Sequence, residues 1–176
     1  MTRPPRLALL AAAALALPAA TGAQSASAPA FSGLYRLVLS AAPGCPASTR
    51  VGPLSVAMDV TQTTVSAGAE VAGVPSSPSA IPDQGRFVLL RQGDRLHGAI
   101  GASALELGLL VIEGTYRIWV QIMADGTAVT ATGGRARASG TAFGEFELSL
   151  ASDPTGAPVG NCKVYAPGHE WSLEPM

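Results

Sequence analysis

The sequence predicts an all-β fold: a single-domain, antiparallel up-and-down β-barrel of about eight to ten short strands, with a β-sandwich as the alternative. Three observations support this. Apolar and polar residues alternate with a period of two, glycine-containing turn signals separate the alternating runs, and no run of helical period follows the N-terminal segment. With 176 residues, 48% hydrophobic and 13% charged, the chain suits one domain with a core.

The first 23 residues predict a cleaved signal peptide. Arg3 and Arg6 supply a positive start, Leu7 to Leu17 is an unbroken run of leucine and alanine, and Thr21-Gly22-Ala23 offers the small residues that a signal peptidase recognises. This apolar run is too short to cross a bilayer as a helix, which takes about 20 residues. We therefore expect an exported protein whose mature chain begins near Gln24.

The remaining chain divides into a flexible segment over 24–30 and a β domain over 31–176. A single lysine beside ten arginines, with heavy use of alanine and glycine, indicates a GC-rich bacterial genome, so the expected compartment is periplasmic or extracellular. No membrane span is expected after signal removal. The formal net charge is −1 and the chain has no basic cluster, which argues against a nucleic-acid partner.

Four segments carry the clearest alternation, and each predicts a strand with one buried face. The residues expected on the buried faces are Tyr35, Leu37 and Leu39; Leu54, Val56, Met58 and Val60; Tyr116, Ile118, Val120 and Ile122; and Phe146, Leu148 and Leu150. The segment Ala102 to Ile112 could form a helix or a strand, and its alternating leucines favour a strand. Three prolines and three serines make 73–85 a loop.

Glycine-containing dipeptides predict the hairpin turns, because glycine readily adopts the positive φ that tight turns need. The candidates are Gln92-Gly93-Asp94, Glu113-Gly114, Asp125-Gly126 and Gly133-Gly134. Asp125-Gly126 is the strongest of them, since alternating residues flank it on both sides.

The two cysteines, Cys45 and Cys162, are expected to form a disulfide. Two cysteines in a small exported domain usually pair, and neither belongs to a Cys-x-x-Cys motif. Free thiols and intermolecular pairing are the alternatives. The bond would tie the end of the first strand to the start of the last.

The sequence Phe31-Ser32-Gly33-Leu34-Tyr35 resembles the Gly-x-Trp motif that opens the first strand of lipocalin and avidin-like barrels, with tyrosine in place of tryptophan. The order of strands, cysteines and glycine-rich hairpins is also similar to that of small exported bacterial β-proteins of unassigned role. The resemblance implies a barrel that holds one small, often apolar ligand. It carries over no ligand-contacting residue, and no C-terminal helix is expected.

Candidate chemistry centres on two histidines. His97 is expected at the surface or rim. In His169-Glu170-Trp171, alternation places His169 and Trp171 on one face and Glu170 on the other. Trp171 is then expected to fill the core with His169 at the rim, and a pocket wall at the barrel mouth is the alternative. The histidines and acids lack metal-ligand spacing, so neither a metal nor a cofactor is expected.

Glu145 and Glu147 could serve acid–base chemistry, but a charge ladder explains them better. If residues 139–143 form a turn, Arg137 faces Glu145 and Arg135 faces Glu147 across a hairpin. If Gly133-Gly134 makes the turn instead, the arginines face elsewhere.

The motifs of serine hydrolases, nucleotide-binding loops and dinucleotide folds are absent from the sequence, so the enzyme hypothesis is the weakest. Three classes of function are expected, in decreasing order: a barrel binding a small apolar ligand, an envelope interaction module acting through its loops, and a cryptic hydrolase or isomerase. Oligomeric state stays open. The candidate ligand-binding residues are Tyr35, Met58, Ile118, Val120, Phe146, His169 and Trp171.

Overall fold

The computed structural model describes residues 29–46, 49, 52–65, 68–76, 85–101, 109–153 and 157–176. The expected signal peptide (1–23) and most of the segment 24–30 lie outside this part. The described residues include nine strands. The strands are β1 (Gly33–Ser40), β2 (Leu54–Val65), β3 (Gly68–Pro75), β4 (Phe87–Gln92), β5 (Arg95–Ile100), β6 (Leu109–Glu113), β7 (Tyr116–Thr130), β8 (Ala136–Leu150) and β9 (Gly160–Pro175). Between β7 and β8 lies the short 3-10 turn η2 (Thr132–Gly134).

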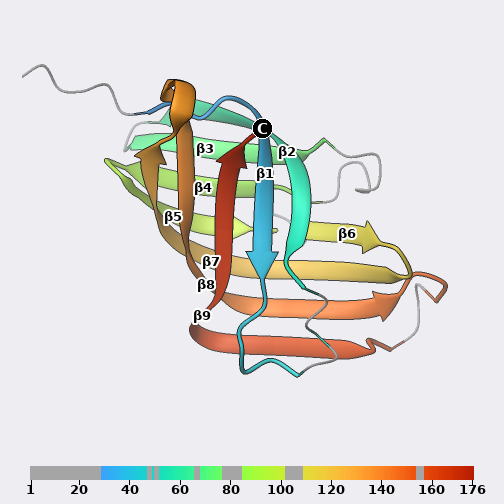
Figure 1. Ribbon diagram of the computed structural model, residues 1–176. Helices are drawn as coiled ribbons and strands as arrows, with labels where there is room; N and C mark the ends of the chain where they lie inside the picture. The colour runs from blue at the N-terminus through green and yellow to red at the C-terminus, as the bar shows by residue number, and fades with distance from the viewer. Residues whose placement is uncertain are drawn as a thin grey trace, which may run out of the picture.

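The strands form a single antiparallel sheet that closes into an uneven barrel (Figure 1). Neighbours along the chain pair from β1 to β5 and from β6 to β9, β9 returns to β1, and β5 pairs with β7. β5 and β6 share the same edge of β7: β5 pairs with Ile122–Thr127 and β6 with Tyr116–Val120. They are therefore two halves of one interrupted strand, and the ring has eight members. This confirms the barrel expectation.

The predicted alternation sets the inner face of the barrel. Nearly all the apolar residues expected to be inward are at most 4% exposed and belong to one contiguous core cluster. The exceptions are Tyr116, which is half-buried, and Leu150, which is 41% exposed, because both stand where β7 and β8 reach the end of the barrel. Three of the four predicted turns also hold, at Gly93, Gly114 and Gly133-Gly134, and each of these glycines has a positive φ.

The Asp125-Gly126 hairpin prediction is wrong, because both residues lie in the middle of β7. The turn between β7 and β8 is at Gly133-Gly134, and Gly126 pairs with Gly140 across these two strands. A Cβ atom at Gly126 would lie 2.6 Å from Cζ2 of Trp171, and one at Gly140 would lie 1.9 Å from the carbonyl oxygen of Asp125. Glycine is thus required here for close packing inside a strand.

The expected charge ladder is also wrong. Residues 139–143 continue β8, so Arg137 and Glu145 lie on the same strand. Arg137 pairs with Val129 in the ladder, whereas Glu145 pairs with Lys163, whose Nζ lies 3.7 Å from Oε2 of Glu145. Arg135 donates hydrogen bonds to the carbonyl oxygens of Ser32, Leu34 and Met176, as the alternative turn at Gly133-Gly134 required.

The expected loop over 73–85 begins later than predicted. Gly73 to Pro75 complete β3, and residues 77–84 lie outside the described part. Of the segment Ala102 to Ile112, the portion from Leu109 onward is strand β6, and 102–108 lie outside the described part.

One end of the barrel is covered by the residues before β1. Phe31 is 1% exposed and packs against Tyr35, with ring centroids 5.9 Å apart. The buried guanidinium of Arg91 lies over the Phe31 ring and donates to the carbonyl oxygens of Pro29 and Gly93. Arg91 thereby satisfies its charge with backbone dipoles while it closes this end of the core.

Candidate functional site

The opposite end of the barrel is closed by the predicted disulfide. Cys45 and Cys162 are bonded, with their Cα atoms 5.4 Å apart. Both are buried and form a small second cluster with Ala42. The bond confirms the expected pairing and indicates an oxidising, non-cytoplasmic environment.

His169 holds the loop that carries Cys45. Its Nδ1 accepts a hydrogen bond from the backbone N–H of Ala42 at 3.0 Å, so the ring is neutral and its Nε2–H donates to the carbonyl oxygen of Gly144 at 3.2 Å. The expected position at the rim is wrong: His169 is 0% exposed, and its ring centroid lies 4.6 Å from that of Phe146. A buried imidazole whose two nitrogens are both hydrogen-bonded to the backbone has a structural role, and we call this pair of bonds the His169 latch.

We expect stability to fall on acidification because of His169. Burial lowers its pKa below the ordinary value of 6.5, an effect that the bond to Gly144 partly offsets. Above pH 6.5 the residue is neutral in both states; below it, the unfolded chain binds the proton first and is favoured. Urea unfolding between pH 7 and pH 5 should therefore show a steeper loss of stability for the wild type than for H169Q. If the free energy of unfolding falls equally with pH in the wild type and in H169Q, the prediction is wrong.

All seven candidate ligand-binding residues lie inside the barrel. Their exposed fractions run from 0% to 3%, and six belong to the contiguous apolar core, with His169 in contact with Phe146. The structure thus brings them together as a packed core, with Trp171 filling it as expected. Binding of a small apolar ligand by these residues stays a prediction.

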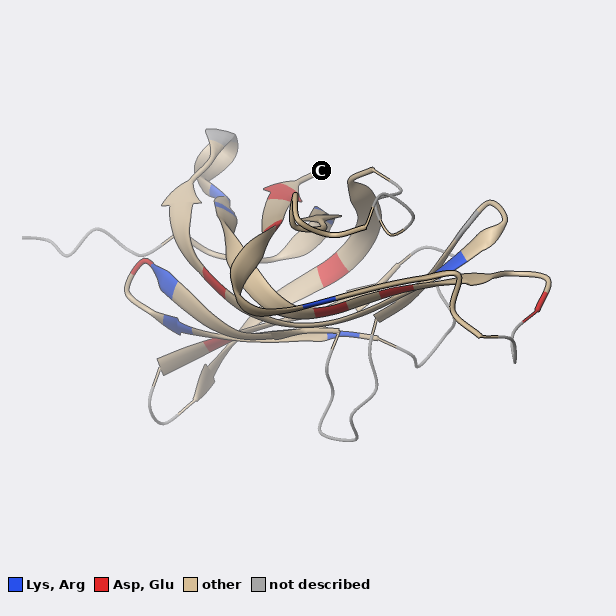
Figure 2. Ribbon diagram, turned by 90° about the horizontal axis from the view of Figure 1, so that it is seen from below, with Lys and Arg blue, Asp and Glu red and all other residues tan. Residues whose placement is uncertain are grey.

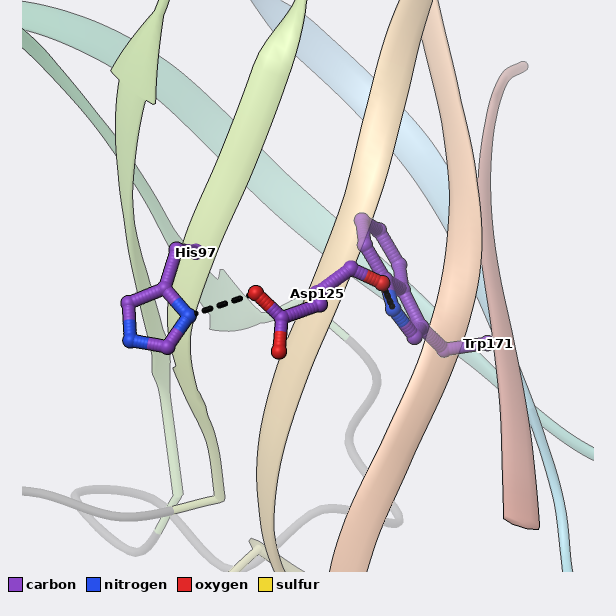
Figure 3. A network of polar contacts seen from close by, with 3 residues as sticks. All are labelled: His97, Asp125 and Trp171. Atoms are coloured by element: carbon purple, nitrogen blue, oxygen red, sulfur yellow. Dashed lines mark hydrogen bonds and ion pairs between the residues drawn. The ribbon is translucent and has the colours of Figure 1, made fainter. Parts of the chain in front are cut away.

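Trp171 links the core to the outer surface. Its indole packs on the inner side of Gly126, and its Nε1–H donates to the backbone carbonyl of Asp125 at 3.1 Å (Figure 3). The side chain of Asp125 points the other way, outward, where Oδ1 accepts a hydrogen bond from Nδ1 of His97 at 2.7 Å. The indole thus anchors the backbone that presents this exposed carboxylate.

A hollow of about 610 Å³ surrounds the His97–Asp125 pair on the outside of the barrel. It crosses β4, β5, β7 and β8, and its polar lining includes Arg95, His97, Asp125, Thr127, Ser139 and Thr141. A second hollow of about 520 Å³ continues over β9 and β1, with Ser40, Glu170 and Ser172 in its lining. The two share Ser139, Gly140 and Thr141, so we name them together the outer groove.

The register of the strands explains this arrangement. His97 pairs with Asp125, and Asp125 pairs with Thr141, so the three side chains form a row across β5, β7 and β8. The next row is Arg95, Thr127 and Ser139. The threonine lies on the far side of Asp125 from His97, so the order of a nucleophile–imidazole–carboxylate triad is not present in this row. The row presents hydrogen-bonding groups to a ligand.

Sequence reasoning placed His97 at the surface correctly but missed the groove. The available signal was the run of outward hydroxyl residues in β7, β8 and β9, at Thr127, Ser139, Thr141 and Ser172. The predicted hairpin at Asp125-Gly126 concealed this signal, because a turn there would separate Asp125 and Thr127 from the residues of β8 with which they pair.

Among the described residues, no group of three or more histidine, cysteine or acidic side chains could hold a metal ion. In the same part of the chain, no helix has the length and apolarity to cross a membrane.

The chain was also compared with known proteins. No protein-family model, curated protein or solved structure matches it.

Proposed function

We propose that this protein is an exported, non-enzymatic β-barrel that binds its partner along the outer groove. The observation that carries the proposal is the contrast between the two faces of the sheet. The inner face is occupied by mutually packed side chains, whereas hollows of ligand size lie on the outer face.

Two features support export. The first 23 residues combine a positive start, a short apolar run and a small-residue cleavage motif. The Cys45–Cys162 disulfide is stable in the oxidising compartments that lie beyond the cytoplasm.

The construction of the groove supports a binding role. Trp171 fixes the backbone of Asp125 from inside, and the glycine pair Gly126–Gly140 lets β7 and β8 approach closely beneath it. These contacts restrain the backbone beneath the groove, and such restraint reduces the entropy lost when a ligand binds.

A small apolar ligand in the interior is the second candidate, and the chemistry of the inner face favours it. The face is apolar except for a few satisfied groups such as His169 and Arg91. Entry would require the core side chains around Met58 and Val120 to move aside, because both are 0% exposed.

Native mass spectrometry and NMR distinguish these candidates. The full-length chain is exported to a bacterial periplasm, purified without denaturant and weighed. We expect a mass that starts at Gln24 and is two hydrogens lighter than the reduced chain, and a mass that retains Met1 would overturn export.

The protein is then prepared in the same way with ¹⁵N label and titrated with a soluble extract of the cell envelope, while NMR follows its backbone amide signals. Shifts confined to the amides of Ser139, Gly140 and Thr141 support the groove. Shifts confined to Met58 and Val120 support the interior ligand and overturn the groove, and an unchanged spectrum also overturns it.

A further inference from the structure

We propose that the outer groove binds a neutral oligosaccharide chain. The inference rests on the proposed function and names its ligand class. It is carried by three properties of the groove: its charge balance, its density of hydroxyl and carboxylate groups, and the pairing of every strand beneath it.

The charges of the groove do not select an ionic ligand. One arginine, Arg95, and two acids, Asp125 and Glu170, are spread over three strands, and Asp125 is already bonded to His97. Figure 2 shows acidic and basic residues interspersed over the strands, without a large field of one sign. Such a surface gives a polyanion or polycation little electrostatic gain, so a ligand without net charge fits best.

The polar groups match a chain of hydroxyls. Ser40, Thr127, Ser139, Thr141 and Ser172 supply hydroxyls that both donate and accept, as sugar hydroxyls do. The second carboxylate oxygen of Asp125 is turned away from His97 (Figure 3). It is placed to accept from a ligand hydroxyl, and a hydrogen bond to a charged group is among the stronger ones available at a surface.

Apolar side chains lie beside these groups, where the C–H faces of sugar rings could rest. Leu90 lines the first hollow and is half-buried. The next outward row consists of Val88, Ala99, Met123 and Phe143, which pair in register across β4, β5, β7 and β8. Binding along this border would remove apolar surface of both molecules from water.

An extended peptide fits the groove less well. Peptides that bind sheets usually add a strand to an unpaired edge. Beneath the groove, β5 pairs with β4 and β7, β8 pairs with β7 and β9, and β9 pairs with β8 and β1. The backbone is therefore committed to the barrel, and recognition must come from side chains.

The test uses defined oligosaccharides. The ¹⁵N-labelled mature protein is titrated with cellohexaose and with the hexamer of N-acetylglucosamine, which are neutral, and with the anionic hexamer of galacturonic acid. We expect at least one neutral hexamer to shift the amides of Thr127, Ser139 and Thr141, and the anionic hexamer to bind more weakly than that neutral hexamer.

Variants then locate the contact. D125A should weaken binding of the neutral hexamer about tenfold, and T141V about two- to tenfold, since each removes a hydrogen-bonding group. T61V is the matched control, because Thr61 is exposed on β2 outside both hollows and should bind as the wild type does. Thermal melting of all three checks that they fold.

The outcomes separate the two proposals. If the envelope extract shifts the groove amides and no neutral hexamer does, the ligand class is wrong and the groove stands. If a neutral hexamer shifts amides elsewhere, or if D125A and T141V bind as T61V does, the proposed contact is wrong.

Discussion

Replacing both cysteines, in C45A/C162A, lowers the free energy of unfolding by about 2–5 kcal/mol. The bond joins residues separated by 117 positions, so removing it releases the long loop that contains β2 to β8 in the unfolded state. Urea unfolding of the mature protein, followed by tryptophan fluorescence, measures the loss.

Reduction provides the control for this prediction. A reductant that breaks the bond should destabilise the wild type by a similar amount and leave C45A/C162A unchanged. If the variant instead unfolds at the wild-type urea concentration, then the His169 latch and the Ala42 cluster hold this end without the bond, and the prediction is wrong.

The W171A variant loses about 3–5 kcal/mol of stability, because the indole is among the largest side chains of the core. Trp171 is 3% exposed, packs on Gly126 and donates its N–H to the carbonyl of Asp125. Its removal leaves a cavity and a carbonyl oxygen without this partner. Urea unfolding checks the value.

W119A is the matched control for this variant. Trp119 lies on β7, the strand that Trp171 contacts from β9, but it points outward and is only half-buried. We expect its loss to stay below about 2 kcal/mol. Equal losses in the two variants would contradict the prediction that the buried indole of Trp171 contributes more to stability than the outward one of Trp119.

W171A also tests whether the groove depends on the core. The His97–Asp125 contact is presented by the backbone that Trp171 holds. The amide signals of Asp125 and Thr141 should therefore shift in W171A and stay in place in W119A.

The sequence predicted the barrel because burial acts directly on single residues. The inward residues of β1 and β2, such as Leu37 and Val56, are recognised from the alternation of apolar and polar residues alone. The Cys45–Cys162 disulfide was predicted correctly from the expected export of the chain and its content of two cysteines. These inferences need no knowledge of which strands are neighbours.

Features that depend on pairing could not be predicted in the same way. Gly126 forms a hairpin signal with Asp125, but its actual role is set by Gly140 and by Trp171, which is distant in sequence. The two glycines stand seven residues on either side of Gly133, which makes the turn. That symmetry was the signal for the long hairpin.

The burial of His169 and the outer groove also depend on contacts between distant parts of the chain. Alternation placed His169 inward, yet only its contacts with Ala42 and Gly144 show that it is fully buried. The groove is assembled from residues of six strands or their ends, so its chemistry appears only when the register is known.

The shared edge of β7 has a consequence for engineering this barrel. β5 ends beside Ile122 and β6 resumes beside Val120, and the backbone nitrogen of Leu109 lies only 2.7 Å from the position of a Cβ on Gly101. The two ends of the intervening stretch therefore meet at one point of the ring. A peptide or a small reporter domain inserted between β5 and β6 would leave the register of the remaining strand pairs intact. This junction is therefore the site at which we expect the barrel to tolerate an insertion.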